Sequence, residues 1–305
     1  MRGSVLSRTQ GAASERNIRV SFEFFPPKND AMEQTLADTI TKLAPLSPDF
    51  ISVTYGAGGS TRDPSKRTLA KVLEQTGVPA AAHLTCVGST KAEVDEVVRD
   101  FASMGINRFV ALRGDPETGM GTQYVPPVDG YETSADLVAG LKAYADFDVS
   151  VSAYPEKHPE SPDFATDIDM LKRKIDNGAC RAITQFFFDN DSYERYVERV
   201  RRAGIYVPIV PGIIPIHNFW SVANFAGRCQ THVPSWLEER FAGLEKDPQT
   251  HALIASAIAA EQVMDLVDRG VEDFHFYTMN RPDLVFAICR LIGIKGDDDN
   301  GVIAA

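Results

Sequence analysis

The sequence predicts a single (β/α)8 barrel of the TIM class, with an extra helical region between the seventh and eighth strands. Short runs rich in β-branched and aromatic residues alternate eight times with amphipathic helical stretches. No change in composition and no linker divides the 305 residues into two domains. The same helix-to-strand turn, with a glycine where a helix C-cap belongs, recurs at Gly105, Gly178, Gly204 and Gly270.

The elements follow in order along the chain. Amphipathic spacing predicts helices between the strands, as over 92–101 and 168–175. Helix starts are expected at Asp63 before Pro64, at Ser134 and at Asp191, and the extra helical region spans 234–269. The predicted strands cover 18–25, 50–55, 80–85, 108–112, 148–153, 182–187, 207–214 and 274–277.

Both ends of the chain are expected to lie outside the barrel. Residues 1–17 are small and polar, and 295–305 contain a run of aspartates that cannot bury much apolar surface. The sequence therefore predicts a flexible N-terminal arm over 1–17, a catalytic barrel domain over 18–294 and a flexible tail over 295–305.

The composition favours small-molecule chemistry. The formal net charge is -11 and no run of Lys or Arg occurs, so we expect neither nucleic acid nor a membrane surface as a partner. No apolar stretch resembles a membrane span or a signal peptide, which predicts a cytoplasmic location. The four cysteines stand alone and no His, Asp or Glu cluster has ligand spacing, so no metal site is expected.

One face of the predicted strands is polar. In the first strand, Val20, Phe22 and Phe24 alternate with Ser21 and Glu23, so the apolar side chains face the helices and the polar ones face the barrel interior. Strands covered on both faces are usually apolar throughout, so this interior is unusual. The same alternation turns further polar side chains inward at Ser52, Thr54, Ser150, Ser152, Tyr154, His275 and Tyr277.

Glu23 is the inward side chain that most needs an explanation. It precedes two prolines that end the strand, at the carboxyl end where barrel enzymes carry out their chemistry. An isolated buried carboxylate is costly and tends to be neutral, with a raised pKa, and a neutral acid in a cleft is a good proton donor. We therefore predict a proton donor here, whereas His83 and His275, each taken alone, are more simply structural histidines.

The sequence resembles the methylenetetrahydrofolate reductase family in a series of blocks that run in order over 20–292. The blocks are long enough to make chance similarity remote. They are SFEFFPPK at 21–28, SVTYGAGG at 52–59, HLT at 83–85, LRGD at 112–115, AYPEKHP at 153–159, ITQFFFD at 183–189, PGIIP at 211–215 and DFHFYTMNR at 273–281.

The resemblance implies an enzyme that uses FAD, with NADH or NADPH as electron donor, to reduce 5,10-methylenetetrahydrofolate to 5-methyltetrahydrofolate. Because both substrates of this family take turns at one flavin face, it also implies ping-pong kinetics. The chain looks like the bacterial form, without the regulatory domain that binds S-adenosylmethionine in the eukaryotic enzymes. A homo-oligomer is expected from the family's bacterial members.

The family motifs also assign roles. Glu23 matches the acid that protonates N10 of the folate, and Asp115 matches the aspartate whose charge favours the cationic iminium and tunes the flavin. Gln185 matches a pterin contact, Phe225 resembles the aromatic that stacks on the folate or on the nucleotide, and Arg281 resembles a further folate contact. Flavin contacts are matched by Thr54, His83, Arg113, Gly114, Asp115, Ser134, Tyr154, His158, Asp167 and Lys174.

Two alternatives stay open at this point. Another flavin-dependent barrel enzyme, such as a proline dehydrogenase, would share the fold and the cofactor but would not need a proton donor at Glu23. A catalytically silent folate- or flavin-binding module is the other alternative. The presence of Glu23, Asp115 and Gln185 together argues against it. At Ser221 the best-known bacterial form has a longer polar side chain, so no role carries over to it.

Overall fold

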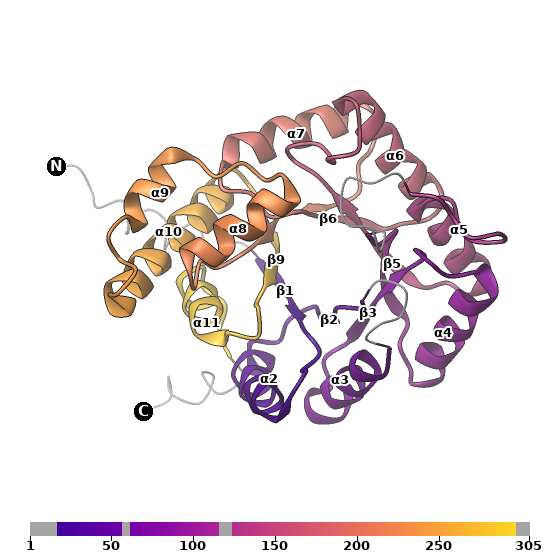
Figure 1. The fold of residues 1–305 in the computed structure, drawn as a ribbon, viewed down its shortest axis with the longest axis horizontal. Coiled ribbons are helices and arrows are strands. Elements are labelled where there is room, and N and C mark those ends of the chain that lie inside the picture. The colour runs from indigo at the N-terminus through magenta and orange to yellow at the C-terminus, as the bar shows by residue number, and fades with distance from the viewer. Residues whose placement is uncertain (1–16, 57–61, 116–123, 297–305) are drawn as a thin grey trace.

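The strands form one parallel sheet in the order β7-β6-β5-β4-β3-β2-β1-β9-β8 in the computed structural model, which describes residues 17–56, 62–115 and 124–296. The helices surround this sheet, and the additional helices gather on one side of it (Figure 1). The strands are β1 Arg19–Phe24, β2 Phe50–Val53, β3 Ala80–Thr85, β4 Arg108–Leu112, β5 Asp148–Ala153, β6 Arg181–Thr184, β7 Ile209–Val210, β8 Gly212–Ile213 and β9 Asp273–Tyr277.

The seventh predicted strand is present in two short pieces. β7 pairs with β6 and β8 pairs with β9, while Pro211 lies between them and has no amide hydrogen to donate. Its carbonyl still accepts a hydrogen bond from the amide of His275 (3.0 Å). The chain itself therefore joins the two ends of the sheet, and the predicted eight-stranded barrel is confirmed.

The helices occupy the predicted places. Three helices, α8 to α10, lie between β8 and β9, and two of them, α9 and α10, fall in the predicted extra helical region over 234–269. The helices are α2 Asp30–Leu43, α3 Arg62–Thr76, α4 Lys91–Ser103, α5 Ser134–Tyr144, α6 Phe164–Asp176, α7 Asn190–Arg202, α8 Phe219–Cys229, α9 Ser235–Phe241, α10 Pro248–Asp268 and α11 Pro282–Leu291, with a 3-10 turn at Ala44–Leu46.

The predicted helix start at Ser134 is confirmed as the first residue of α5, whereas the start predicted at Asp191 is off by one residue, since α7 begins at Asn190. The N-cap of α5 is Thr133, whose hydroxyl accepts from the amide of Asp136 while the Asp136 carboxylate accepts from the amide of Thr133. This reciprocal pair makes Thr133 a better cap than Ser134. In α7 the cap is Asp189, not Asp191.

The predicted glycine turns are confirmed. Gly105, Gly178, Gly204 and Gly270 all have positive φ, between 79° and 109°. Other residues adopt this left-handed conformation only at a cost, which explains the repeated use of glycine between helix and strand.

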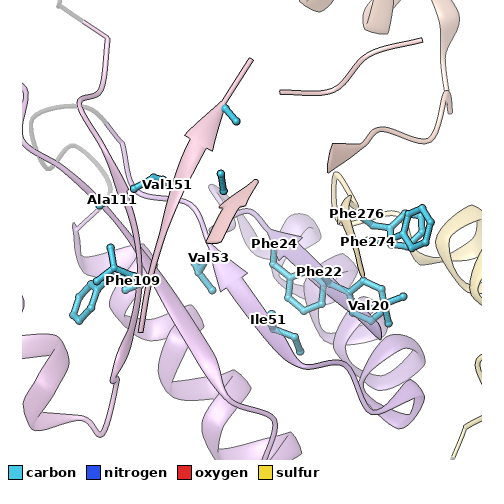
Figure 2. Close-up of a cluster of buried hydrophobic side chains, with 14 of the residues drawn as sticks. Val20, Phe22, Phe24, Ile51, Val53, Phe109, Ala111, Val151, Phe274 and Phe276 are labelled. Atoms are coloured by element: carbon cyan, nitrogen blue, oxygen red, sulfur yellow. The ribbon is translucent and has the colours of Figure 1, made fainter. Parts of the chain in front are cut away.

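The main core lies between the outer face of the barrel and the helices. Phe22 and Phe24 are completely buried, as are Phe274 and Phe276 on the neighbouring β9. Figure 2 shows these residues together with Val20 and with apolar residues of β2, β4 and β5. The alternation predicted for the first strand is therefore confirmed, and it leaves Ser21 and Glu23 for the interior.

The predicted arm and tail fall almost wholly outside the described residues, which omit 1–16 and 297–305. Their flexibility stays a prediction. Within the described parts of the chain, no helix is both long and apolar enough to cross a membrane.

Candidate active site

Glu23 lies at the upper, carboxyl end of β1, with 6% of its surface exposed. Pairing of β1 with β2 and β9 sets it beside Ser52 and Tyr277. Nε2 of His83 lies 3.3 Å from its Oε2 atom, and Nε2 of His275 lies 3.8 Å from the same oxygen. The interior therefore holds a carboxylate between two imidazoles, each supplied by a different strand.

The structure corrects the predicted charge state of Glu23. Burial favours the neutral acid, but the electrostatic attraction of His83 and the approach of His275 outweigh it and lower the pKa of Glu23 to about 2. Burial also lowers the pKa of His275, against the opposing effect of Glu23. At neutral pH, Glu23 is thus a carboxylate, not the neutral acid that the sequence predicts. The prediction of a raised pKa for Glu23 was wrong because this pKa depends on residues far away in the sequence. His83 and His275, which lie close to the carboxylate, follow Glu23 by 60 and 252 residues.

Beside this cluster, a cavity of about 570 Å3 opens at the upper end of the barrel. Its volume is typical of a site for a cofactor-sized ligand. Ten of the residues predicted from the family motifs line it: Arg113, Gly114, Asp115, Ser134, Tyr154, His158, Asp167, Lys174, Gln185 and Phe225.

Two of the cations that line the cavity, Arg113 and Lys174, differ in their partners. Arg113 donates to both oxygens of Glu160, at 2.6 and 2.7 Å, and its guanidinium lies over the ring of Tyr124. Lys174 is buried and donates to the carbonyl and the hydroxyl of Ser152 (3.0 and 3.3 Å). Burial lowers the pKa of Lys174 to about 8, so the ammonium is held at a cost that an anionic ligand would offset.

Asp167 organises the loop that follows β5. Its Oδ1 atom accepts from the amide of His158 and from the hydroxyl of Ser161, both at 3.2 Å. Burial raises its pKa, and the charge of Lys174 opposes this effect. The contacts of Asp167 are thus mainly with the wall of the cavity.

His158 presents a neutral ring to the cavity. Its Nδ1 accepts from the amide of Glu160 (3.1 Å), so the ring proton is on Nε2. Desolvation lowers the pKa of His158 to about 4. The ring meets that of Tyr154 edge to face, with centroids 4.6 Å apart. These residues offer a neutral donor and an aromatic wall.

The remaining cavity residues come from three parts of the chain: the start of α5, the segment after β6, and α8. Ser134 and Thr133 place the N-terminal end of α5 at one wall. Gln185, directly after β6, accepts from the amide of Phe186 (3.1 Å). Phe225 of α8 stacks on Phe186 with ring centroids 5.3 Å apart, so it is a packed residue that also faces the cavity.

Gly114 has a structural reason to be glycine. Its φ is +86°, and an added Cβ would lie 2.5 Å from a methyl group of Val87 and 3.0 Å from Cβ of Thr85. The backbone after β4 can therefore pack closely against β3 only without a side chain here.

Four predicted site residues do not line this cavity. Glu23 and His83 form the neighbouring interior cluster, Thr54 lies at the end of β2, and Arg281 is exposed as the N-cap of α11. Asp115 is exposed at the cavity rim, where partial desolvation raises its pKa and Arg113 opposes the rise. Their ligand contacts stay predictions.

The sequence left three residues of this region unrecognised. Glu160 binds Arg113, although no residue pattern pointed to that pairing. Tyr196 lines the cavity, and its buried hydroxyl has no hydrogen-bond partner among the described residues. The same holds for the hydroxyl of Thr85, which strand alternation places on the same face as His83.

The cavity suits an elongated ligand that carries both an anionic group and aromatic rings. Arg113, Lys174 and the end of α5 provide positive charge and amide donors, and Tyr154 and Phe225 provide ring surfaces. The unpartnered hydroxyl of Tyr196 is available to an acceptor. Among the described residues, no group of three or more His, Cys, Asp or Glu side chains could hold a metal ion.

A second hollow of about 700 Å3 lies at the opposite end of the barrel, between α7 and the start of β9. It is more open to solvent and its charged side chains are largely paired, as Arg269 is with Asp191 and Glu194. Because the chemistry of (β/α)8 barrels gathers at the other end, this hollow is not the candidate site.

Comparison with known proteins identifies the family. Residues 8–293 match the model of the methylenetetrahydrofolate reductase family. The chain belongs to this family. It is 46% identical to the 5,10-methylenetetrahydrofolate reductase of Salmonella typhimurium and 45% identical to that of Escherichia coli, in each case over 93% of this chain and 94% of the relative.

A more distant relative agrees with this assignment, and a solved structure agrees with the fold. A probable methylenetetrahydrofolate reductase (NADH) of Oryza sativa is 31% identical over 95% of this chain and 50% of its own length. A solved structure from Clostridium thermocellum, which binds two copies of 5-methyl-5,6,7,8-tetrahydrofolic acid, has the same fold with a TM-score of 0.62. It is 14% identical, over 93% of this chain and 96% of that one.

The family match decides between the alternatives. The chain is a methylenetetrahydrofolate reductase of the bacterial type, and not a proline dehydrogenase or a silent binding module. The methylenetetrahydrofolate reductases are a family that uses FAD, and the donor set of the cavity is compatible with that cofactor.

Proposed function

We propose that Glu23 supplies the proton for the folate half-reaction and that FAD binds in the cavity beside it. The observation that carries this proposal is the position of Glu23. Its carboxylate is buried at the carboxyl end of β1, within reach of two imidazoles. Bound FAD would supply the hydride transfer from NADH or NADPH to the folate, in ping-pong order.

We infer that different cavity residues bind different parts of the cofactor. Arg113 and Lys174 hold the diphosphate, with amide donors of α5 near Ser134. Nε2 of His158 donates to a neutral acceptor, and Tyr154 covers an aromatic ring. Gly114, Thr54, His83 and Asp167 complete the site, Asp167 by fixing the loop that carries His158.

The proton step follows from the chemistry of the substrate. Protonation of N10 lets the bond between N10 and the bridging methylene carbon break, which opens the five-membered ring and leaves a cationic iminium carbon ready for hydride. Glu23 gives up the proton and returns to the carboxylate, the form that His83 and His275 stabilise. The charge of Asp115 favours the developing cation.

We infer that the ionised Glu23 takes up a proton from solvent when folate binds. A bound pterin excludes water from the mouth of the barrel, and desolvation favours the neutral acid. Glu23 thus keeps its predicted role as proton donor, but its resting form is the carboxylate and not the predicted neutral acid. Gln185 would bind the pterin, Phe225 would stack on an aromatic part of the substrate, and Arg281 would attract its anionic end.

We also infer a cytoplasmic homo-oligomer, as the bacterial members of the family suggest. Light scattering on the purified protein would measure the number of copies, and a monomer at working concentration would contradict the inference.

The function is tested by two half-reactions. Protein loaded with FAD should lose its yellow colour when NADH or NADPH is added without oxygen, and methylenetetrahydrofolate should restore it. The faster of the two nucleotides identifies the physiological donor. Failure of folate to restore the colour would contradict the proposed reaction.

A further inference from the structure

The side of Glu23 that faces β9 carries a hydrogen-bonded pair, Ser21 and His275, that the proposed reaction does not yet use. Oγ of Ser21 lies 2.7 Å from Nδ1 of His275, and Nε2 of the same ring lies 3.8 Å from Oε2 of Glu23. Ser21 and His275 are both buried, and their strands pair in register at these two residues.

The contacts fix the tautomer of His275. Oγ of Ser21 is closer to Nδ1 than to the carbonyl of Phe274, which lies 3.3 Å away. A bare Nε2 facing a carboxylate would be repelled, so we assign the ring proton to Nε2 and the hydroxyl proton of Ser21 to the bond with Nδ1. The ring is also held by stacking on Phe50, with centroids 5.9 Å apart.

We propose that Ser21 and His275 are positioning residues of the folate half-reaction. By directing an N–H group at Oε2, they hold Glu23 in one orientation and favour its carboxylate form, and so set the pH at which it can act as the acid. This inference rests on the proposed function of Glu23 and deepens it.

The neighbouring titratable and charged groups do not take over the role of the pair formed by Ser21 and His275. His83 of β3 approaches Oε2 from another strand, and Tyr277 of β9 stays protonated because burial raises its pKa. Arg181 of β6 acts on His275 only by its charge and is already bonded to Asp148. Of the two histidines beside Glu23, only His275 has such a hydrogen-bond partner among the described residues, namely Ser21.

The sign of the expected effect follows from the approach of Nε2 of His275 to Oε2 of Glu23. Loss of the N–H group makes the acid form of Glu23 relatively more favourable, and the folate step uses that form. The pH at which the folate step falls to half its maximum should therefore move upward, by about one pH unit when the donor is lost.

The experiment compares four variants in both half-reactions. His275→Asn removes a donor from the position of Nε2, whereas His275→Gln carries an amide N–H close to that position and should rescue the original pH profile. Ser21→Ala keeps the imidazole ring of His275 but removes the hydrogen bond that fixes its tautomer. It also keeps the test available if a His275 variant does not fold. Ser52→Ala is the matched control, since it removes another buried hydroxyl, whose one hydrogen bond within the described part of the chain is to a backbone carbonyl of β1 (3.5 Å).

Stopped-flow reoxidation of the reduced protein by methylenetetrahydrofolate would be followed across pH. We expect His275→Asn and Ser21→Ala to raise the half-maximal pH, with reduction by the nicotinamide nucleotide unchanged in all four variants. Unchanged pH profiles in folded Ser21→Ala and His275→Asn, or a shift in His275→Gln as large as in His275→Asn, would overturn the proposal. Failure of the unmodified protein to react with folate would instead overturn the proposed function.

Discussion

The two ends of the barrel interior differ in whether their charged and polar groups have partners. At the lower end, Arg19 pairs with Asp273 (2.8 Å), and Asp148 binds Arg181 (2.6 Å) and approaches Arg108 (3.5 Å). The guanidinium groups of Arg108 and Arg181 lie 5.7 and 5.5 Å from the centroid of the Phe50 ring. At this end, each of these charges has an opposite charge beside it.

At the upper, carboxyl end, several buried polar groups of the described residues have no hydrogen-bond partner. Among the described residues, Nε2 of His83, the hydroxyl of Thr85 and the hydroxyl of Tyr196 have no hydrogen-bond partner. Lys174 is buried with a lowered pKa. Such groups cost stability unless a ligand satisfies them. The lower end thus stabilises the fold, and the upper end is prepared for cofactor and substrate.

The largest expected effect is at the upper end. Glu23→Gln keeps the shape of the side chain but cannot donate the proton, so folate reduction should fall by roughly 10²- to 10⁴-fold. Reduction of the bound flavin by the nicotinamide nucleotide should continue. Stopped-flow absorbance of both half-reactions measures the difference, and equal loss of both with flavin still bound would contradict the acid role.

A smaller effect is expected from the cavity cations. Lys174→Met removes a charge-assisted contact to the diphosphate, which is worth about 1.5–3 kcal/mol, or roughly 10- to 100-fold in FAD affinity. Lys172→Met is a matched control on the same helix, because Lys172 is exposed and pairs only with Asp176. Fluorescence titration with FAD measures both, and equal affinities would exclude Lys174 from the cofactor site.

At the lower end the prediction concerns stability alone. Asp148→Asn should lower the free energy of unfolding by about 1–3 kcal/mol, because the pair with Arg181 is half-buried. Asp146→Asn, at an exposed carboxylate, should have no measurable effect. Urea unfolding measures the stability, and altered half-reactions in Asp148→Asn would show that the two ends are not separate in function.

The smallest effect is a pH dependence of cofactor binding. Without ligand, the pKa of Lys174 is about 8, and a bound diphosphate would raise it. FAD affinity should therefore be constant below pH 8 and fall above it, by at most about tenfold per pH unit. FAD titrations from pH 7 to 9 measure this, and Lys174→Arg should remove the decline.

Most of this architecture could be predicted from the sequence because it depends on local patterns. Alternation placed Glu23 inside and Phe22 outside, and glycines marked the helix ends. The family motifs gathered ten residues that do line one cavity. Properties that depend on contacts between distant segments could not be predicted in this way. The charge of Glu23 depends on His83 and His275, and the partner of Arg113 is Glu160.

The central claim is that Glu23 rests as a carboxylate and becomes an acid only when folate is bound. Infrared difference spectra between the unmodified protein and Glu23→Gln, at neutral pH, report this state directly. Without folate, we expect no C=O stretch of a protonated carboxyl from Glu23, and with an unreactive analogue of methylenetetrahydrofolate bound this band should appear. A protonated-carboxyl band already present without folate would contradict the account.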